Sequence, residues 1–466
     1  MHLNRFLAPA SLLLPALAFL PTPVAATNGM NMEGYGPVAT ALGGASMAYE
    51  NGTAAVINNP ATLSLLPEGN RLDLAVGMLG PRITATTAAG TAADSRADAF
   101  FMPAFGYAHR RGALTAGFAV FGQGGMGCEY DADSWRGLGF GLLNRTEVSV
   151  GRAIVPLSYR INDQLSVAAT IDFVWAGMDL KMAMSGAQFM DLVGTHQTGQ
   201  ASGTIVQSFG QMLATLPAGT AVDYAYFDFS NGSDFTGAAR GYGYAAKAGL
   251  VYTPSPDLSF GVTYHSQTRL SDLKAGGANL AFQIDIPEMG AIAQTLAGDI
   301  TVRDFEWPAM FAAGVAWYPA AGWMVACDVR RVFWADVMEN FSLRFTADDT
   351  SANGSFAGQD LAALLYQNWS DQTVIQIGVA YDVSKRLTLR AGYNHGKDPI
   401  PDNFLNCLFP ATVEDHLTAG FGWKFSDRSS IDASLVYGFP HEVTNGGGVT
   451  VRHSQYNLQL LYAFRF

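Results

Sequence analysis

A short unit of alternating apolar and polar residues recurs five times along the chain. In each copy an alternating segment ends near an aromatic residue, turns within a few polar residues and restarts as another alternating segment. Alternation with period two is the pattern of a β-strand with one apolar face, so each copy predicts a β-hairpin. The copies are Ile154–Ile161 with Leu165–Met178, Ala245–Thr253 with Leu258–Thr268, Met310–Tyr318 with Trp323–Phe333, Val374–Val383 with Leu387–Asn394, and Leu417–Phe425 with Ser430–Phe439.

Further alternating segments flank these hairpins. Arg71–Leu79, Ala99–Tyr107 and Ala113–Phe121 precede them, and Arg452–Phe466 closes the chain. Together the segments predict about 14 antiparallel strands, an even number as in bacterial outer-membrane β-barrels. Short turns at one end and long loops at the other are typical of the same class. We therefore predict an all-β membrane fold, with the transmembrane β-barrel over residues 69–466.

The last strand illustrates the two faces. Tyr456, Leu458 and Leu460 share one face, whereas Asn457 and Gln459 share the other. In a barrel that spans a membrane, the apolar face meets lipid and the small or polar face lines the lumen.

Composition supports a lipid environment. Apolar residues make up 49% of the 466 residues and charged residues only 14%, whereas soluble proteins carry about 25% charged residues. After the N-terminus no apolar run reaches the roughly 20 residues that a membrane-spanning helix needs. The net charge of −12 without a basic stripe excludes nucleic acid as a partner.

The first 26 residues have the features of a secretory signal peptide. Arg5 precedes the apolar run Phe6–Leu20, and small residues end the segment at Val24-Ala25-Ala26. We expect cleavage after Ala26 and an address in the outer membrane of a Gram-negative bacterium.

Residues 27–68 do not alternate and are rich in Gly, Ala and Asn. A segment this short cannot form an independent core, so we expect a small hatch that plugs the barrel, with a periplasmic arm as the alternative. Its candidate residues are Gly43, Gly44 and the triplet Asn59, Pro60 and Ala61. Asn59 has either a gating role or the structural role of an Asn that shapes a turn.

The two longest loops contain apolar segments. In Asp179–Gly241, residues 187–216 have apolar spacings of three and four, which predict amphipathic helix in two pieces broken around Gly199–Gly203. Met289–Leu296 in Ser271–Glu306 is a second helical candidate. These segments either form a hydrophobic groove for a ligand or pack on each other as a lid. The groove candidates are Phe189, Met190, Leu192, Phe209, Met212, Leu213, Leu216, Met289, Ile292 and Leu296.

No catalytic or metal chemistry emerges from the sequence. Cys128, Cys327 and Cys407 lack metal-ligand spacing, although Cys128 and Cys407 fall in outward regions and could pair. The histidines are scattered, so no cofactor is predicted. A lipase or protease would need a Ser, His and acid cluster, and a structural barrel would have polar loops. We therefore predict a protein that is not an enzyme.

The N-terminal motifs carry a family resemblance. Asn28-Gly29, Glu33-Gly34-Tyr35-Gly36, Leu42-Gly43-Gly44-Ala45 and Asn59-Pro60-Ala61, followed by Asn70-Arg71-Leu72-Asp73-Leu74, resemble the hatch and first strand of the FadL long-chain fatty acid transporter family. This family also includes channels for aromatic hydrocarbons. The resemblance implies a monomeric 14-stranded barrel with an N-terminal hatch, embedded in outer-membrane lipid.

The resemblance also implies a transport path. Ligand first binds between the two long loops and leaves sideways, by passive diffusion, through a gap at a kink in the third strand. Here that strand ends in a glycine-rich run, and the gate candidates are Gly122, Gly124, Gly125 and Gly127.

The expected substrate is a long-chain fatty acid, with aromatic or alkane hydrocarbons as the alternative. A fatty acid carboxylate would need a cationic partner in the lumen. Alternation predicts that Lys424 and Arg465 face inward, and Arg330 and Arg390 are further candidates.

Overall fold

The computed structural model describes residues 28–233 and 236–466, so the expected signal peptide lies outside the described residues. The strands join into one sheet of 22 strands. The sheet therefore has more strands than the predicted number of about 14, an even number typical of bacterial barrels. The reason is that the outward loops contain additional strands. Among the described residues, no helix is both long enough and apolar enough to cross a bilayer.

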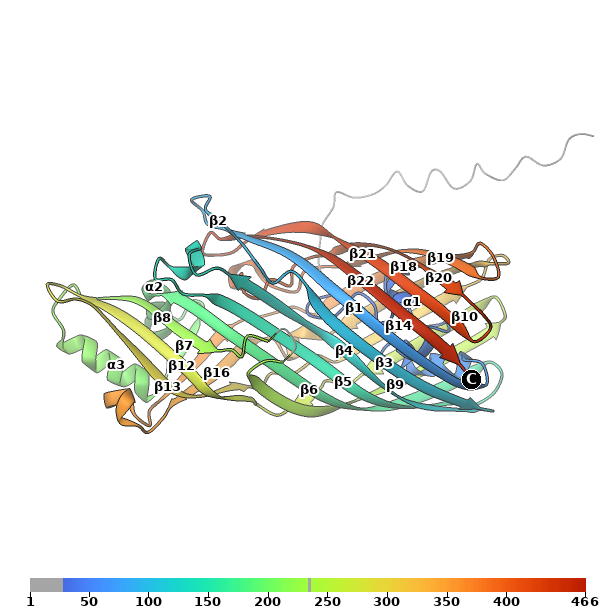
Figure 1. The fold of residues 1–466 in the computed structure, drawn as a ribbon, viewed down its shortest axis with the longest axis horizontal. Coiled ribbons are helices and arrows are strands. Elements are labelled where there is room, and N and C mark those ends of the chain that lie inside the picture. The colour runs from blue at the N-terminus through green and yellow to red at the C-terminus, as the bar shows by residue number, and fades with distance from the viewer. Residues whose placement is uncertain (1–27, 234–235) are drawn as a thin grey trace, which may run out of the picture.

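Strands make up most of the described chain, and short helical turns lie at only some of the connections between them (Figure 1). The α-helices are α1 (Pro37–Thr40), α2 (Gly186–Met190) and α3 (Thr204–Thr215). The strands are β1 (Gly69–Thr86), β2 (Ala92–Asp94), β3 (Phe100–Arg111), β4 (Leu114–Tyr130), β5 (Asn144–Arg160), β6 (Leu165–Ser185), β7 (Gly199–Ser202), β8 (Ala221–Phe229), β9 (Ala239–Ser255), β10 (Leu258–His265), β11 (Arg269–Leu270), β12 (Leu273–Ile286), β13 (Gly290–Arg303), β14 (Met310–Trp317), β15 (Trp323–Val332), β16 (Asn340–Ala347), β17 (Asp360–Tyr366), β18 (Gln372–Asp382), β19 (Leu387–Gly396), β20 (Asp415–Lys424), β21 (Ser429–Thr444) and β22 (Thr450–Arg465).

The long strands close into a barrel. Starting from β1, the antiparallel pairing runs through β3, β4, β5, β6, β9, β10, β14, β15, β18, β19, β20, β21 and β22. The first and last strands then pair from Arg71↔Arg465 to Thr86↔Thr450, which closes the ring. The five predicted hairpins are confirmed, each with a short turn at the same end of the barrel.

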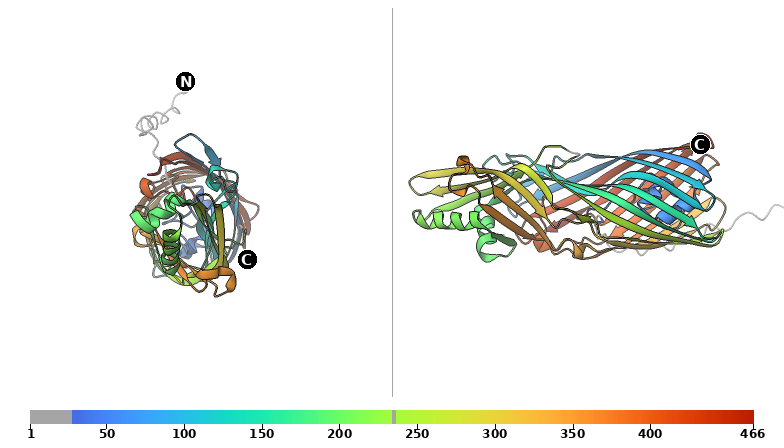
Figure 2. Two further views of the ribbon diagram at one scale, coloured as in Figure 1. Left: turned by 90° about the vertical axis from the view of Figure 1, so that its left-hand side faces the viewer. Right: turned by 90° about the horizontal axis from the view of Figure 1, so that it is seen from below.

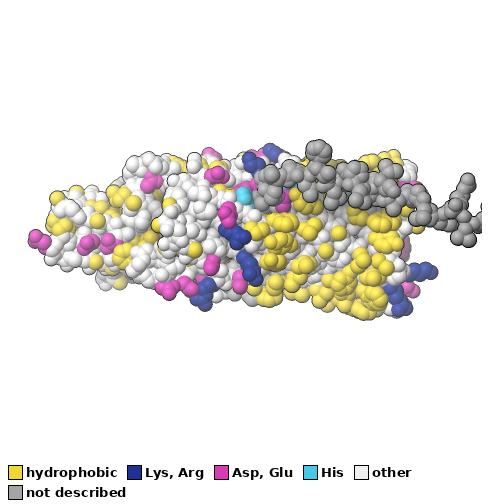
Figure 3. All heavy atoms as spheres, turned by 90° about the horizontal axis from the view of Figure 1, so that it is seen from above, with side chains coloured by type: hydrophobic (Ala, Val, Ile, Leu, Met, Phe, Trp, Pro, Cys, Tyr) yellow, Lys and Arg dark blue, Asp and Glu magenta, His cyan; other side chains and the backbone are white. Residues whose placement is uncertain are grey.

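The outer face of the barrel is apolar. In β22 the outward side chains Tyr456, Leu458 and Leu460 are exposed, whereas the inward Asn457 and Gln459 are buried, as the alternation predicts. Figure 3 shows a broad hydrophobic belt on one half of the molecule, with charged side chains at both of its edges. This is the arrangement of a barrel that meets hydrocarbon along the belt.

Beyond the belt the strands continue into an outward extension. There β6, β8, β12, β13, β16, β17 and β7 pair in that order, and α3 packs beside them (Figures 1 and 2). The helical prediction for residues 187–216 is confirmed, because α2 and α3 flank the break at β7. The helical prediction for Met289–Leu296 is wrong, because these residues form the turn and start of β13. The apolar residues Met289, Ile292 and Leu296 are three and four positions apart, but they do not share one face: Ile292 is exposed and Leu296 is buried.

Residues 28–68 are almost entirely buried by the inward faces of the barrel strands. Asn394 of β19 donates to the Gly43 carbonyl at 3.0 Å, and the Asp328 carboxylate of β15 accepts from the backbone N–H of Ser46 at 2.6 Å and of Met47 at 3.0 Å. In the end-on view this N-terminal segment lies within the outline of the strands (Figure 2).

Candidate ligand-binding site at a break in the barrel wall

The wall of the barrel is interrupted between β3 and β4. The two strands pair only from Arg111↔Leu114 to Phe105↔Val120. Within residues 28–233, no further pairing joins Phe100–Ala104 to Phe121–Tyr130, although both stretches remain strands through their other neighbours, β1 and β5. We call this opening the wall break.

The outward end of the wall break is closed again by the chain before β3. The backbone N–H of Arg96 donates to the Glu129 carbonyl at 2.7 Å, and the Arg96 guanidinium pairs with Asp131 at 2.5 Å. The break is therefore a window in the wall, bounded by hydrogen bonds at both ends.

Local sequence explains why the pairing stops. Pro103 of β3 has no N–H to donate to a neighbouring strand. On β4 the pairing with β5 shifts by a bulge between Gly122 and Gly124. Beyond the bulge, the Gly125 N–H donates to the Met30 carbonyl at 3.2 Å. The N-terminal segment thus supplies a partner that β3 does not.

The same segment binds the residue within the bulge. The Tyr35 hydroxyl donates to the Gln123 carbonyl at 2.5 Å, and the Gln123 side chain donates to Asn31 at 3.1 Å. β4 therefore turns its backbone toward the lumen where a continuous barrel would present it to the next strand.

An apolar cavity of about 290 Å³ lies at the wall break. The four predicted gate glycines, Gly122, Gly124, Gly125 and Gly127, all line it. Four aromatic rings and several other apolar side chains complete most of the lining: Phe100, Phe101, Phe121, Trp175, Leu79, Pro81, Ile83, Met102, Pro103, Val120, Met126, Val148 and Val150.

Two of the aromatic rings lie directly on glycines. A Cβ atom added to Gly127 would be 2.6 Å from the Phe100 ring, and one added to Gly151 would be 2.3 Å from the Trp175 ring. Glycine is required where a ring approaches the backbone this closely. Because Phe100 belongs to β3 and Gly127 to β4, the Phe100 ring bridges the wall break from one side to the other.

Few polar side chains reach the cavity. They are Glu147, Ser149, His453 and Gln455. Glu147 pairs with Arg145 at 2.8 Å, and Arg145 also pairs with Glu129 at 2.6 Å. Among the described residues, Glu147 therefore brings a carboxylate to this edge of the cavity. Such an edge disfavours an anionic ligand.

A loop between two strands farther round the barrel contributes to the cavity lining. We call residues 397–414, between β19 and β20, the inward loop. Its Ala411 lines the cavity, and its Pro410 carbonyl lies 2.7 Å from the His453 ring. Burial raises the pKa of Asp398 in this loop to about 7, and the neighbouring Glu414 carboxylate acts in the same direction.

Comparisons with known proteins agree with this architecture. A family profile described as "Outer membrane protein transport protein (OMPP1/FadL/TodX)" matches residues 21–460. The chain belongs to this FadL/TodX family.

Individual relatives of this FadL/TodX chain include solved transporters. The chain is 28% identical to the P. putida toluene transporter TodX, with a TM-score of 0.79 and coverage of 93% of this chain and 99% of that one. The Ralstonia pickettii toluene transporter TbuX is 27% identical, with a TM-score of 0.74 and the same coverage.

A curated relative, the long-chain fatty acid transport protein of Escherichia coli O6:H1, is 24% identical over 218 residues, which are 44% of this chain and 45% of the relative. The chain spans less than half the length of the curated relatives it matches.

Membership places the FadL/TodX chain among transport proteins of the outer membrane. The predictions of an outer-membrane location and of a protein that is not an enzyme are thereby confirmed.

The predicted groove residues of this FadL/TodX chain gather mainly in a packed cluster in the extension. Phe189, Phe209 and Phe282 follow one another at ring-centroid distances of 5.6 and 4.9 Å. Leu192 and Leu296 are buried in the same cluster, and Met212, Leu213 and Leu216 pack against it. Met190, Met289 and Ile292 are exposed. Leu192 also lines a separate cavity of about 190 Å³ beneath the extension.

The four basic candidates lie apart from the wall-break cavity. Arg465 and Arg390 each pair with an acid, and Lys424 is exposed at the end of β20. Arg330 is 1% exposed, and its Nε and Nη1 atoms have no hydrogen-bond partner among the described residues.

The hatch candidates hold the N-terminal segment to the barrel. Asn59 caps the helical turn Pro60–Leu65 by accepting from Ala61 N–H at 3.1 Å, and it donates to the Leu250 carbonyl of β9 at 3.1 Å. Gly43 donates to the Thr418 hydroxyl at 2.9 Å. These contacts support the structural role of Asn59.

Sequence reasoning missed the aromatic lining of the cavity. Phe100, Phe101 and Met102 form three consecutive large apolar residues, which break the alternation of a strand with one face toward a lumen. That break in alternation was the available signal.

Proposed function

We propose that this protein carries small neutral aromatic hydrocarbons across the outer membrane by passive diffusion, with lateral exit through the wall break. The observation that carries the proposal is the apolar, aromatic-lined cavity at that break. An apolar cavity of about 150 Å³ is known to hold benzene. A cavity of about 290 Å³ therefore has room for a substituted single ring.

The chemistry of the lining supports a neutral ligand. Glu147 lies at the cavity, and the basic candidates lie elsewhere, so a carboxylate in this site would meet an acid without a dedicated cation. An arene needs no such partner. Aromatic rings such as those of Phe100 and Trp175 also offer edge-to-face contacts to a bound ring.

The expected affinity suits transport. Seven buried carbons at about 0.8 kcal/mol each give roughly 5–6 kcal/mol, or a dissociation constant of about 0.1 mM. Binding of this strength draws an arene out of water and still permits release. No energy source is needed for movement down a concentration gradient.

We further propose that residues 28–68 act as a hatch in a monomeric barrel. The support is the set of hydrogen bonds from this segment to β4, β9, β15, β19 and β20. A segment held in this way blocks direct flow to the periplasm and leaves the wall break as the exit. The outward aromatic and aliphatic side chains make outer-membrane lipid the surrounding partner.

The test is uptake of radiolabelled toluene and oleate by a host that lacks its own transporter of this family. The proposal predicts that the protein increases toluene uptake well above oleate uptake. If uptake of neither compound rises, the protein does not transport them. If only oleate uptake rises, the aromatic substrate is wrong.

A long-chain fatty acid is the second candidate. The curated relative from Escherichia coli supports it, as does the buried guanidinium of Arg330, whose Nε and Nη1 lack partners among the described residues. If oleate is carried, Arg330→Leu should reduce oleate uptake and leave toluene uptake unchanged. Arg390→Leu, which removes a cation already paired with Asp432, is the matched control.

A further inference from the structure

Two buried cysteines lie at the junction of the wall break and the inward loop. Cys128 follows Gly127 on β4, in the stretch that has lost its pairing with β3, and Cys407 lies on the inward loop. Cys128 is 0% exposed and Cys407 is 4% exposed. Both carry free thiols in the structure.

One side chain connects the inward loop to the strand that carries Cys128. The Tyr130 hydroxyl donates to the Cys407 carbonyl at 2.9 Å, and Tyr130 lies two residues after Cys128 on the same strand, β4. Cys128, Tyr130 and Cys407 are all buried in one hydrophobic cluster.

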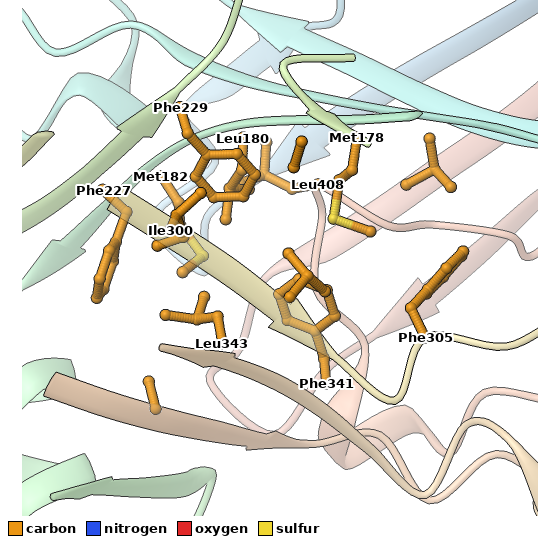
Figure 4. Close-up of a cluster of buried hydrophobic side chains, with 14 of the residues drawn as sticks. Met178, Leu180, Met182, Phe227, Phe229, Ile300, Phe305, Phe341, Leu343 and Leu408 are labelled. Carbon is orange, nitrogen blue, oxygen red and sulfur yellow. The ribbon is translucent and has the colours of Figure 1, made fainter. Parts of the chain in front are cut away.

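The neighbouring strand fixes the next residue of the loop. Thr146 of β5 is the register partner of Cys128, and its hydroxyl donates to the Leu408 carbonyl at 2.6 Å. The Leu408 side chain points into the hydrophobic cluster that includes Met178 and Leu180 (Figure 4). The backbone at Cys407 is thus held in place on both sides, against the part of β4 that carries Cys128.

We propose that Cys128 and Cys407 form a disulfide bond that fastens the inward loop to β4 beside the wall break. A disulfide needs Cα atoms about 4–7 Å apart. The bonds from Tyr130 to Cys407 and from Thr146 to Leu408 hold this part of the inward loop against β4 at Cys128. A protein that faces the outside of the cell folds in an oxidising compartment, where such bonds persist. Cys327 lies in β15, in another part of the barrel, and remains a free thiol.

The reaction is thiol–disulfide exchange with a protein disulfide of the folding compartment. Two S–H bonds break and one S–S bond forms between the cysteines, while the donor disulfide takes up the two electrons and two protons and becomes two thiols. Because both sulfurs are buried in the folded protein, the bond forms before the inward loop docks.

The consequence concerns the free edge of β4. A strand without a neighbour on one side lacks half of its ladder hydrogen bonds, and its unpaired edge is free to move. The bond would anchor that edge to a loop that itself lines the cavity through Ala411. The shape of the wall break would then be covalently set.

The first test counts thiols. The full chain is purified from outer membranes without reductant, denatured with an alkylating reagent, and weighed as intact protein. One adduct, on Cys327, is expected, and three after reduction. Peptide mapping should recover the linked pair. Three adducts without reduction, or a link between other cysteines, would overturn the proposal.

Variants identify the partners. Cys327→Ser should give no adduct before reduction, and Cys128→Ser should give two, on Cys327 and the released Cys407. Two adducts in Cys128→Ser require only that the chain is made, not that the barrel is fully stable. No adduct in this variant would mean that Cys327 and Cys407 are paired and would exclude Cys128 as the partner.

The second test addresses the anchoring itself. Hydrogen exchange of residues 397–414 is compared before and after reduction of the folded protein in detergent. Faster exchange on reduction is expected in the wild type, and no response in Cys128→Ser. Identical exchange in oxidised and reduced wild type would refute the anchoring role. Neither test depends on the ligand.

Discussion

The seam between β3 and β4 and the seam between β14 and β15 both belong to tight hairpins, yet only one is complete. Every residue of β14, from Met310 to Trp317, has a partner in β15. In β3 only Phe105–Arg111 are paired with β4. The hairpin pattern is the same in both. The difference comes from a proline, a bulge and glycines that let β4 bond to the N-terminal segment. Local backbone chemistry therefore decides where a barrel wall opens.

The largest expected effect comes from filling the open seam. Gly127→Leu places a branched side chain where the Phe100 ring lies, and its bulk would extend into the cavity. We expect uptake of toluene to fall by about tenfold or more, because the exit is obstructed while pairing with β5 is retained. Initial uptake rates in cells measure the effect.

Gly210→Leu is the matched control, because a side chain at this helical position meets nothing within 4 Å. It should transport like the wild type. Normal uptake by Gly127→Leu at equal membrane levels would rule out the wall break as the exit.

The next effect concerns the N-terminal segment, which hydrogen-bonds both β4 and β15 from inside the barrel. Asp73 of β1 accepts from the Thr53 N–H at 2.9 Å and pairs with Arg71 at 2.8 Å. Asp73→Ala removes the Thr53 acceptor and one carboxylate from the buried Arg71, which keeps Glu50 at 2.9 Å. The loss should therefore be smaller than the cost of a fully unpaired buried charge, which is about 3–5 kcal/mol. We expect the segment to loosen and the barrel to conduct ions in planar bilayers.

Asp382→Ala, at an exposed position on the same side of the barrel as the short turns, is the control and should remain closed. If the Asp73→Ala barrel conducts no ions, the segment does not act as a hatch.

A smaller effect is expected on ligand size. Phe100→Ala removes the ring that bridges the open seam and enlarges the cavity. Uptake should shift toward larger arenes, such as naphthalene relative to toluene, by about three- to tenfold, since pocket selectivity for small apolar groups is about 1–3 kcal/mol at most. Phe118→Ala removes an outward ring of β4 and should leave the ratio unchanged. If Phe100→Ala does not change the ratio of naphthalene to toluene uptake, Phe100 does not set the selectivity for ligand size.

The smallest effect is a pH dependence of the inward loop. Burial raises the pKa of Asp398 from 3.8 to about 7, so the docked loop holds a proton that the undocked loop has lost. Docking is therefore favoured at low pH and weakens as pH rises from about 4 to 7. Burial also raises the pKa of Glu414, which therefore acts in the same direction. Of the other charges near Asp398, Asp402 raises its pKa and Lys397 lowers it.

Hydrogen exchange of residues 397–414 should therefore be faster at pH 8 than at pH 5 after correction for intrinsic rates. Asp398→Asn should flatten this dependence. An equal or reversed dependence in the wild type would contradict the role of Asp398.

The strands of the barrel were predictable because each lies between two different environments. In β20, Leu417 and Phe421 face outward and Thr418 is buried, so the chemistry of the sequence repeats every two residues. The outward extension lacks this contrast, since one of its faces meets water and the other meets α3 or its own core. There a spacing of three and four, as at Ile292 and Leu296, does not distinguish a helix from a hairpin.

The candidate site was predictable only in part. Glycines are visible in sequence because few positions need them, and the run from Gly122 to Gly127 lies at the cavity. The rings that complete the cavity come from β3, β4 and β6, and Trp175 of β6 is far in sequence from Phe100 and Phe101 of β3. Their convergence depends on the register between strands, which composition does not encode. The basic candidates lie away from this cavity, because inward direction alone does not specify depth in the barrel.

With the proposed lateral exit, a window that faces hydrocarbon would make this barrel a catalyst of partitioning. Phe101 and Phe105 beside the opening are exposed on the outer face, where the surrounding phase is lipid. Such a device speeds the approach to equilibrium between the medium and the membrane and cannot raise the solute above its partition coefficient. Net flux inward then depends on whatever removes the solute from the membrane. Without a process that removes the solute, the membrane would reach its equilibrium solute content sooner, and that content would be no higher.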